Sequence, residues 1–370
     1  SRVDSTQKIV KLINDHKINL KCFLVGSAIG IYGDSGDENL SESTPAGNDF
    51  LGKVCQEWEQ QLTDLPSSVR NVALRTGLVL SRQEGLLEKL ELPAMYNLLS
   101  PLGSGQQFMS WIHIYDWVNA VIECLHNIKI QGAVNLVAPE PVNNLIFTKM
   151  FCKQVNKFMA PAIPRFVLQM ALGEMSAAIL GSQKVQPKAL MEHGFKFRFE
   201  NLTQALEHLY PTPIEEKLYI QRQWFQGSPK EIFPFFSQAN NLEKITPPFL
   251  NFKVNKVSTS SIAQGTVIDY SLKLHGIPLH WRSEIAEWQP PKEFVDIQLK
   301  GPYNKWHHRH QFTPLAGGTL MEDVVQYRLP FTRLSQWFLG FKIKNDIEKI
   351  FSFRKKYLDQ NIDEIRQEDH

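Results

Sequence analysis

The sequence predicts two domains of different fold class: an α/β domain with a parallel sheet over residues 1–210 and an α+β domain with an antiparallel sheet over residues 216–360. In the first, short runs rich in β-branched residues alternate with helical patterns, as in sheets with crossover helices. In the second, alternating runs follow one another with only turns between them, and a long amphipathic pattern closes the region. The two prolines in Tyr210-Pro211-Thr212-Pro213 are unfavourable in helices and in strand ladders, so we predict a linker at 211–215. Residues 361–370 are predicted to form a C-terminal tail.

The composition excludes several classes of protein. With 370 residues the chain is longer than one ordinary domain. The hydrophobic share of 43% argues against disorder. Because 40 Lys+Arg nearly balance 38 Asp+Glu, we expect no nucleic-acid partner. The four cysteines have no paired spacing, which favours reduced thiols and a cytoplasmic protein. Prolines and charges interrupt the most apolar region, 158–181, and no signal peptide is visible, so we expect no membrane span. The oligomeric state stays open.

The elements of the first domain are expected from hydrophobic period and capping residues. Asn201 is a favourable N-cap for a helix that follows it. Asp116 is expected to cap the helix at 117–127. His113 is expected to be a hydrogen-bonded residue at a strand end, so the two residues are not expected to form a catalytic pair. We expect strands at 21–25, 69–80, 109–114, 134–137 and 195–199, and helices at 50–62, 85–99, 117–127, 166–180, 187–193 and 202–209.

A phosphate-binding glycine loop, which normally opens a nucleotide-binding α/β domain, does not precede these elements. Gly30-x-x-Gly33-x-x-Gly36 has the letters of a dinucleotide fingerprint. However, a fingerprint must lead into a helix, whereas here an acidic, serine-rich stretch follows that would repel a pyrophosphate. We therefore interpret residues 26–33 as a strand that ends in a loop of small residues.

The second domain shows strong local signals. Ser228 as N-cap with Pro229 at the first helical position predicts a helix start. Gly276, Pro290-Pro291 and the pair Gly317-Gly318 fall between alternating runs, as turns of a meander do. The final helix is expected over 333–358, with an apolar stripe that a curved sheet could grip around a pocket. The stripe comprises Leu334, Trp337, Phe338, Phe341, Ile347, Ile350 and Phe351, and the strands are expected at 217–225, 252–259, 266–274, 279–288, 294–300, 306–313 and 320–328.

Several motifs of the first domain together resemble one known family. They are Ser27 before Tyr32-Gly33, Ser104-Gly105-x-x-Phe108-x-x-Trp111-Ile112-His113-Ile114-x-Asp116, Asn135-Leu136-x-Ala138-Pro139, Gly181-Ser182-Gln183-Lys184-Val185-x-Pro187 and Gly194-Phe195-x-Phe197. The chain resembles the epimerase family of the extended short-chain dehydrogenase/reductase superfamily. The resemblance implies a partial Rossmann-like fold and, for the intact parent protein, an NAD(P)-dependent epimerase-like or oxidoreductase-like activity on a small-molecule substrate, such as a sugar nucleotide.

The same resemblance implies where the cofactor loop lies. In that family, residues 1–6 belong to a helix after the third strand, so the glycine loop is expected upstream of Ser1. We therefore expect no cofactor and no activity for this chain alone.

Catalytic candidates by this resemblance are Ser27, Tyr32 and Lys53, and cofactor-binding candidates are Lys53 and Arg75. Superfamily chemistry needs a Tyr acid/base four residues before a Lys, but Asp49 stands four before Lys53. Tyr32 could substitute only if its loop folds toward Ser27. The alternatives are a packing role for Tyr32, an exposed ion pair of Asp49 with Lys53, and a sheet-edge ion pair for Arg75.

In the second domain, strand alternation places His308 and His310 on one face with Trp306 and Phe312. Two imidazoles at that spacing could ligate zinc, but no third ligand can be named, although His275 and His280 exist, so we predict pocket-lining histidines and no metal. The wider pattern resembles the START-like (SRPBCC-type) superfamily, which implies a helix-grip fold around an apolar cavity. It is carried by Trp281-x-x-x-Ile285, Phe294-x-Asp296-x-Gln298, Gly301-Pro302-Tyr303, Trp306-x-His308-x-His310-x-Phe312 and Thr319-x-Met321-x-Asp323, and the ligand-binding candidates are Tyr270, Trp281, Trp306, His308 and His310.

Two classes of function therefore stay open, and whether the chain is an enzyme stays open with them. One is the NAD(P)-linked chemistry of the first domain. The other is a non-catalytic carrier, sensor or cell-division-linked regulator that binds an apolar ligand in the second domain. A regulator linked to cell division is included because the epimerase family that the chain resembles has a plastid member linked to cell division. A structural adaptor is the third possibility.

Overall fold

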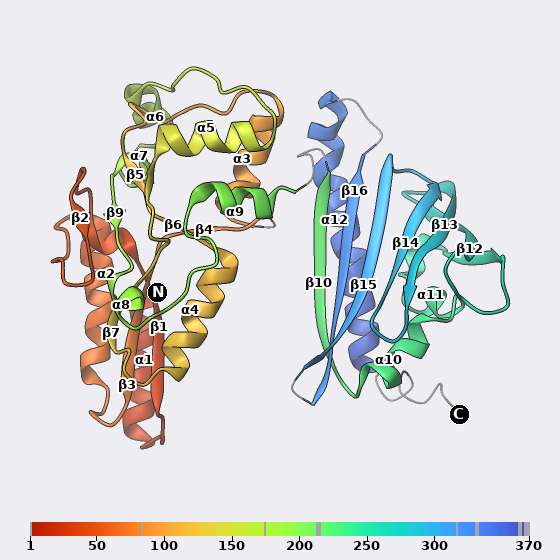
Figure 1. The fold of residues 1–370 in the computed structure, drawn as a ribbon, viewed down its shortest axis with the longest axis horizontal. Helices are drawn as coiled ribbons and strands as arrows, with labels where there is room; N and C mark the ends of the chain where they lie inside the picture. The colour runs from red at the N-terminus through yellow and green to blue at the C-terminus, as the bar shows by residue number, and fades with distance from the viewer. Residues whose placement is uncertain are drawn as a thin grey trace. The chain divides into compact units, whose positions relative to one another are not determined.

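A computed structural model describes residues 2–82, 84–173, 175–211, 216–315, 317–329, 333–361 and 365. The chain divides into two compact units, residues 1–214 and 215–370 (Figure 1). Most of the predicted linker at 211–215 and of the tail at 361–370 lies outside the described residues. Among the described residues, no helix combines the length and apolar character that a membrane crossing requires.

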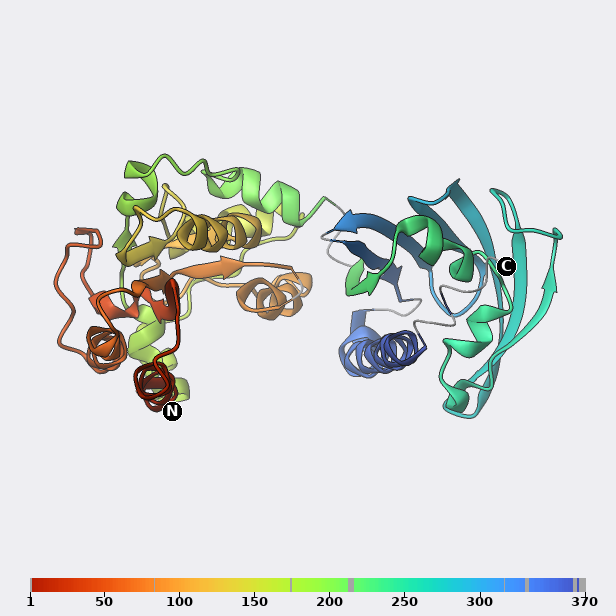
Figure 2. The same ribbon diagram turned by 90° about the horizontal axis from the view of Figure 1, so that it is seen from below.

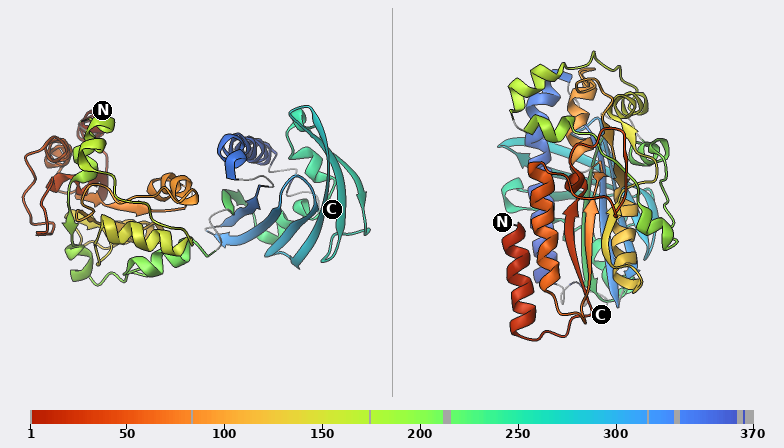
Figure 3. Two further views of the ribbon diagram at one scale, coloured as in Figure 1. Left: turned by 90° about the horizontal axis from the view of Figure 1, so that it is seen from above. Right: turned by 90° about the vertical axis from the view of Figure 1, so that its left-hand side faces the viewer.

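The first unit is built on a three-stranded parallel sheet of β1 (Cys22–Ala28), β3 (Arg70–Thr76) and β7 (Gly132–Leu136), with β3 in the centre. Parallel neighbours need crossover connections, and α2 (Phe50–Gln60) and α4 (Ile114–His126) lie in these connections. Alternate residues of β3 face opposite layers, because Ala73 packs with α1 (Arg2–Asp15) whereas Val72 and Leu74 pack with α4. Figure 3 (right) shows α1 and α2 along one side of the strands and α4 along the other.

The rest of the unit consists of short strand pairs and helices, several of which surround an apolar core in which Trp111, Phe147 and Phe151 are fully buried. Asn201 Oδ1 accepts a hydrogen bond from Gln204 N, which confirms the predicted cap. The strand pairs are β4 (Leu78–Leu80) with β6 (Trp111–His113), β2 (Asn39–Leu40) with β9 (Lys184–Val185), and β5 (Phe108–Met109) with β8 (Val142–Asn143); the helices are α3 (Leu86–Met95), α5 (Asn144–Gln154), α6 (Arg165–Leu172), α7 (Met175–Leu180), α8 (Lys188–Glu192) and α9 (Leu202–Leu209).

Four predicted elements of this unit are wrong: the strand expected at 109–114 is divided between β5 and β6, and three others differ in ways that have clear causes. The strand expected at 69–80 is interrupted at Gly77, where a Cβ atom would lie 2.6 Å from the backbone oxygen of Ser110. The helix expected at 166–180 is divided at Gly173, which has a positive φ of 55°. The strand expected at 195–199 does not form, because Arg198 N and Phe199 N donate to the Asp116 carboxylate instead of to a ladder.

The second unit is a seven-stranded antiparallel sheet with the order β10-β16-β15-β14-β13-β12-β11. The first strand of the unit therefore pairs with the last, and the remaining strands form a meander. The predicted strands agree with the observed ones to within a few residues. The bounds are β10 Lys217–Gln226, β11 Lys253–Val257, β12 Val267–Leu274, β13 Ile277–Gln289, β14 Glu293–Lys300, β15 Lys305–Leu315 and β16 Gly318–Arg328.

Helices cover one face of this sheet. The long helix α12 (Arg333–Gln360) packs Ile347 and Phe351 against Val325 and Tyr327 of β16, and α10 (Pro229–Phe236) and the short α11 (Asn241–Lys244) follow β10. Figure 2 views α12 nearly along its axis, with the sheet curving around it and around α10. The predicted stripe residues Leu334, Trp337, Phe338 and Phe341 have side chains outside the described set.

Candidate functional site

In each unit, one group of buried polar side chains contains candidates predicted from the sequence. In the first unit, the catalytic candidates lie near the carboxyl end of β1, where ligands of open α/β sheets usually bind. Ser27 is 7% exposed and its Oγ donates to Glu59 Oε1 at 2.6 Å. Tyr32, in the 3-10 turn after β1, is 3% exposed, and its hydroxyl donates to Asn135 Oδ1 at 2.7 Å. Ser27 and Tyr32 therefore point to different partners.

Arg75 on β3 joins these two side chains. Its guanidinium donates to Glu59 through two bonds, Nε to Oε1 at 3.0 Å and Nη2 to Oε2 at 2.8 Å, and to the Tyr32 hydroxyl through Nη1 at 2.9 Å. Burial raises the pKa of Tyr32, against the opposing effect of Arg75, so the hydroxyl is protonated at neutral pH. Burial alone would lower the pKa of Arg75, but its bonds to Glu59 raise it further above its ordinary value. Ser27, Tyr32 and Arg75 therefore all have hydrogen-bond partners within this network.

Lys53 does not join the network. It is exposed on the first turns of α2, and the residue four before it, Asp49, is the N-cap of that helix, with Oδ1 accepting from Gly52 N at 2.7 Å. The structure thus brings together Ser27, Tyr32 and Arg75 but leaves out Lys53. Sequence reasoning missed Glu59, whose signal is indirect: an arginine on a central buried strand needs an acidic partner.

The glycine run 30–36 lies in a turn and a loop, and no helix follows until α2. Gly33 and Gly36 have positive φ angles of 67° and 61°. The acidic residue between them, Asp34, accepts from Ser182 N at 3.0 Å, which ties the loop to the segment before β9. The interpretation of this run as a small-residue loop is therefore confirmed, and the phosphate-loop reading is not supported.

His113 and Asp116 have structural contacts. The N-cap of α4 is His113, whose Nδ1 accepts from Tyr115 N at 3.0 Å, so the prediction that Asp116 caps this helix is wrong. Asp116 lies within the first turn and accepts from Arg198 N and Phe199 N, both at 2.9 Å. Burial, followed by the charges of His208 and Arg198, lowers the pKa of His113 to about 4. A neutral His113, with Nε2 3.1 Å from His208 Nδ1, fits a packing role.

The second unit encloses a cavity of about 200 Å³ between the sheet and the helices α10, α11 and α12. Most of its lining is apolar, including Ile268, Ile347 and Phe351. Two N–H groups on its wall, Trp281 Nε1 and Arg354 Nε, are buried and have no hydrogen-bond partner among the described residues. The five ligand-binding candidates all line this cavity: Tyr270, Trp281, Trp306, His308 and His310.

Aromatic stacking shapes one wall of the cavity. Tyr270 and Trp281 lie on the paired strands β12 and β13 in direct register, with ring centroids 5.9 Å apart and an angle of 18° between the planes. Trp306 meets Trp281 edge-on, with centroids 5.2 Å apart. These contacts hold the rings that face the apolar space in fixed orientations.

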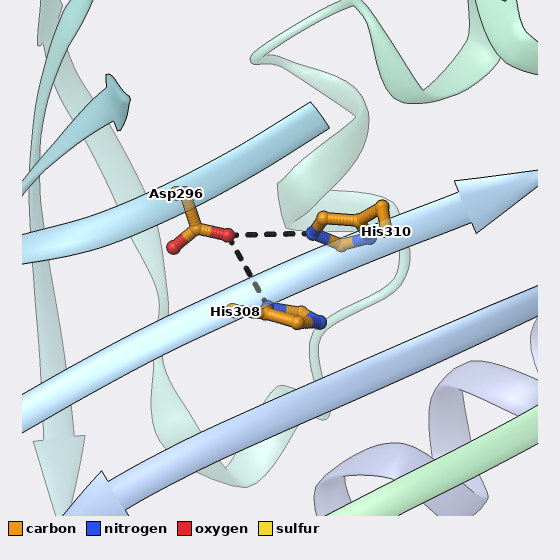
Figure 4. Close-up of side chains that lie close together, drawn as sticks. All are labelled: Asp296, His308 and His310. Atoms are coloured by element: carbon orange, nitrogen blue, oxygen red, sulfur yellow. Dashed lines mark hydrogen bonds and ion pairs between the residues drawn. The ribbon is translucent and has the colours of Figure 1, made fainter. Parts of the chain in front are cut away.

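A closed ring of four ionisable side chains lies on the sheet side of the cavity. His308 and His310 are alternate residues of β15 and share a face; β14 places Asp296 beside His308, and β16 places Asp323 beside His310. Asp296 Oδ2 lies 3.3 Å from both His308 Nδ1 and His310 Nε2 (Figure 4). Asp323 Oδ1 lies 3.1 Å from His308 Nε2 and 2.7 Å from His310 Nδ1. Arg354 of α12 completes the cluster.

The charges of this cluster depend on one another. Burial opposes ionisation of Asp296, but the charge of His308 holds the pKa of that carboxyl well below its usual range. Burial likewise lowers the pKa of His308, but Asp296 outweighs it and raises the value. Burial and the charge of His308 lower the pKa of His310. His275 and His280 are not part of the cluster, because both are exposed and His275 pairs with Asp346 at 2.8 Å.

Comparison with known proteins identifies the family. A family described as "Domain of unknown function (DUF1731)" matches residues 163–209. Epimerase family protein ML0860 of Mycobacterium leprae (strain TN) is 32% identical over 217 residues, which are 58% of this chain and 70% of that protein. The chain belongs to the epimerase family. The predicted resemblance to this family of the short-chain dehydrogenase/reductase superfamily is thereby confirmed.

Two further relatives show how far the likeness extends. "Epimerase family protein SDR39U1 homolog, chloroplastic" of Arabidopsis thaliana is 35% identical over 213 residues, which are 56% of this chain and 60% of that protein. The crystal structure of human epimerase family protein SDR39U1 (isoform2) with NADPH matches with a TM-score of 0.54 and 30% identity, covering 57% of this chain and 72% of the human one. The match to this chain thus spans 60% of the Arabidopsis thaliana protein and 70% of the Mycobacterium leprae protein. The cytoplasmic location stays a prediction.

Proposed function

We propose that the second unit binds an apolar small molecule that carries a hydrogen-bond acceptor, in a START-like, helix-grip arrangement. The observation that carries this proposal is the pair of buried N–H groups without a partner, Trp281 Nε1 and Arg354 Nε, on the wall of a mostly apolar cavity. A buried donor without a partner costs about 1–3 kcal/mol. An acceptor on a bound molecule removes this cost, while the aromatic wall accommodates its apolar body.

The cavity restricts the size of such a ligand. Its volume of about 200 Å³ is below the roughly 300–1,000 Å³ of most small-molecule sites. A compact molecule, such as a single ring system with one carboxylate, hydroxyl or carbonyl group, fits this space better than a long-chain lipid. A carrier or sensor of such a compound is the function that the geometry supports best.

A fluorescence titration tests this proposal. The probe is 2-naphthoate, a fluorescent molecule with a single fused ring system and a carboxylate acceptor. We expect saturable binding at one site, weakened roughly 5- to 10-fold by Trp281→Phe, because that change removes one hydrogen bond worth about 1 kcal/mol. The control is Trp224→Phe, since Trp224 is 47% exposed and donates to Leu315 O. Equal effects of the two substitutions, or binding that never saturates, would contradict the proposal.

NAD(P)-linked chemistry in the first unit is the second candidate, and family membership favours it. Against it stands the geometry. The Tyr32 hydroxyl is occupied by Arg75 and Asn135, and Lys53 is exposed outside that network. The usual Tyr–Lys acid/base pair is therefore not assembled, and ligand binding ranks first.

A titration with NADPH decides between the two candidates. Because the only glycine run with a fingerprint spacing among the described residues leads into a loop, we expect no saturable change of NADPH fluorescence. Saturable tight binding would favour the enzymatic candidate. In that case Tyr32→Phe should lower the rate of any hydride transfer that the chain supports.

A further inference from the structure

The ring of histidines and aspartates in the second unit has the arrangement of a metal centre. We propose that Asp296, His308 and His310 bind one divalent transition-metal ion of the Zn²⁺ type. The inference does not depend on the proposed ligand, although the three residues also line the cavity. Their ligand atoms all lie within 4.8 Å of one another.

The two distances from the carboxylate oxygen to the histidine nitrogens fit this ion. Zinc ligands at about 2.0–2.2 Å from the metal lie roughly 3.3–3.6 Å apart in a tetrahedral site. Asp296 Oδ2 lies 3.3 Å from His308 Nδ1 and 3.3 Å from His310 Nε2. Dashed lines mark these two contacts in Figure 4. A carboxylate and two imidazoles are a common ligand set for zinc and for other late first-row metals. Asp296 is the third ligand that the sequence pattern could not supply.

The opposite side of the ring supplies outer-shell support. Asp323 Oδ1 lies 3.1 Å from His308 Nε2 and 2.7 Å from His310 Nδ1, so it can accept the N–H of both rings. This assignment leaves His308 Nδ1 and His310 Nε2 as lone-pair donors toward Asp296. Metal-binding histidines usually donate their other N–H to such a carboxylate, which fixes their tautomer and orientation.

Arg354 balances the charge of this outer shell. Its Nη1 lies 3.6 Å from Asp323 Oδ1, and its Nη2 lies 3.4 Å from His310 Nδ1. The latter contact is longer than the 2.7 Å between His310 Nδ1 and Asp323, so we assign the Nδ1 proton to the carboxylate contact. With Arg354 facing Asp323, the remaining carboxylate, Asp296, is available to the ion.

Hydrogen-bond counting also favours an ion. The ring has four nitrogen–oxygen contacts, and each needs a proton if no ion is present. Two neutral imidazoles supply two protons, both used toward Asp323 in the arrangement above. One imidazolium would supply a third proton, but supplying the fourth as well would place two positive rings with centroids 3.8 Å apart in a buried site. A divalent cation on the Asp296 side replaces both missing protons.

Three protein ligands leave a coordination position open, and the ligand residues border the cavity. Sites with an open position bind water or a substrate group, in contrast to closed structural sites. The chemical class that would occupy it is a water molecule or an oxygen of a carboxylate, hydroxyl or carbonyl group.

Titration of the metal-free full chain with Co²⁺ tests the inference, because visible d–d bands report four- or five-coordination. We expect one Co²⁺ per chain, displaced by Zn²⁺, with one equivalent of zinc confirmed by elemental analysis. Asp323→Asn should weaken binding roughly 10- to 100-fold through loss of outer-shell support. Asp296→Asn should weaken it more. The matched control, His280→Gln, removes an exposed histidine of the same unit and should leave the affinity unchanged.

Several outcomes would overturn the inference: absence of d–d bands in the wild-type chain, a stoichiometry below one, or equal losses in Asp296→Asn and His280→Gln. If Asp296→Asn does not fold, Zn²⁺-dependent thermal stabilisation of the wild type and of His308→Gln decides the question, since only the former should respond. Binding of 2-naphthoate is measured on the metal-free chain. Failure of the metal site is thereby distinguishable from failure of the apolar site.

Discussion

Arg75 and Glu59 form a two-point ion pair between β3 and α2, with Nε 3.0 Å from Oε1 and Nη2 2.8 Å from Oε2. Both side chains are largely buried, with exposed fractions of 10% and 15%. The same carboxylate accepts from Ser27, and the same guanidinium donates to Tyr32. Two of the three residues that resemblance marks as catalytic, Ser27 and Tyr32, are thus held by an ion pair that links the sheet to its crossover helix.

Glu59→Ala should destabilise the first unit by about 3–5 kcal/mol, because it leaves the Arg75 charge buried without its partner. Hydrogen exchange of peptides from β1 and β3 measures the change in this unit separately from the other. Glu57→Ala is the control, since Glu57 is an exposed residue of the same helix. A similar loss in both variants would mean that helix propensity, and not the ion pair, is responsible.

The stability of the first unit should fall as pH decreases from about 6.5 to about 4, because of His113. Its pKa in the folded chain is about 4, below the ordinary 6.5, so the unfolded chain binds the proton more tightly. Folding stability therefore rises with pH across this window, and the contribution is complete above it. The 2.5-unit difference corresponds to at most about 3 kcal/mol.

Urea unfolding at several pH values measures this effect. His113→Asn retains a capping side chain but does not titrate, so its stability should change less between pH 7 and about pH 4.5. Burial and the charge of Arg198 also lower the pKa of His208, which adds dependence of the same sign. An identical pH profile in His113→Asn and wild type would exclude His113 as the source.

Asp116→Ala should release the segment around Arg198 and Phe199 from α4. Two backbone N–H groups lose their acceptor, which costs roughly 1–3 kcal/mol. Hydrogen exchange of residues 195–201 should accelerate, whereas Glu207→Ala on the exposed face of α9 should leave it unchanged. Unchanged protection in Asp116→Ala would show that packing alone holds the segment.

Glu231→Ala should destabilise the second unit by about 1 kcal/mol. Glu231 Oε2 accepts from Ser228 N at 2.7 Å and from Ser228 Oγ at 2.8 Å, which closes the first turn of α10. Lys230→Ala changes the exposed neighbour and serves as the control in denaturant titrations. Equal midpoints for wild type and Glu231→Ala would contradict a stabilising cap.

The strands of the second unit could be predicted because alternation and turn residues are local signals. The interruption at Gly77 and the loop at 195–199 could not, because they depend on Ser110 and Asp116, which are distant in sequence. The same distinction applies to the sites. Alternation placed His308 and His310 on one face, but the pairing of Asp296 with His308 depends on the register between β14 and β15.

Arg354 belongs to α12, whereas the residues it faces belong to the sheet. Any displacement of this helix away from the sheet would widen the cavity and, in the same movement, separate a guanidinium from Asp323. The vacated carboxylate would then compete with Asp296 for protons or cations. The volume of the cavity and the charge beside the histidine pair therefore both depend on the position of the same helix.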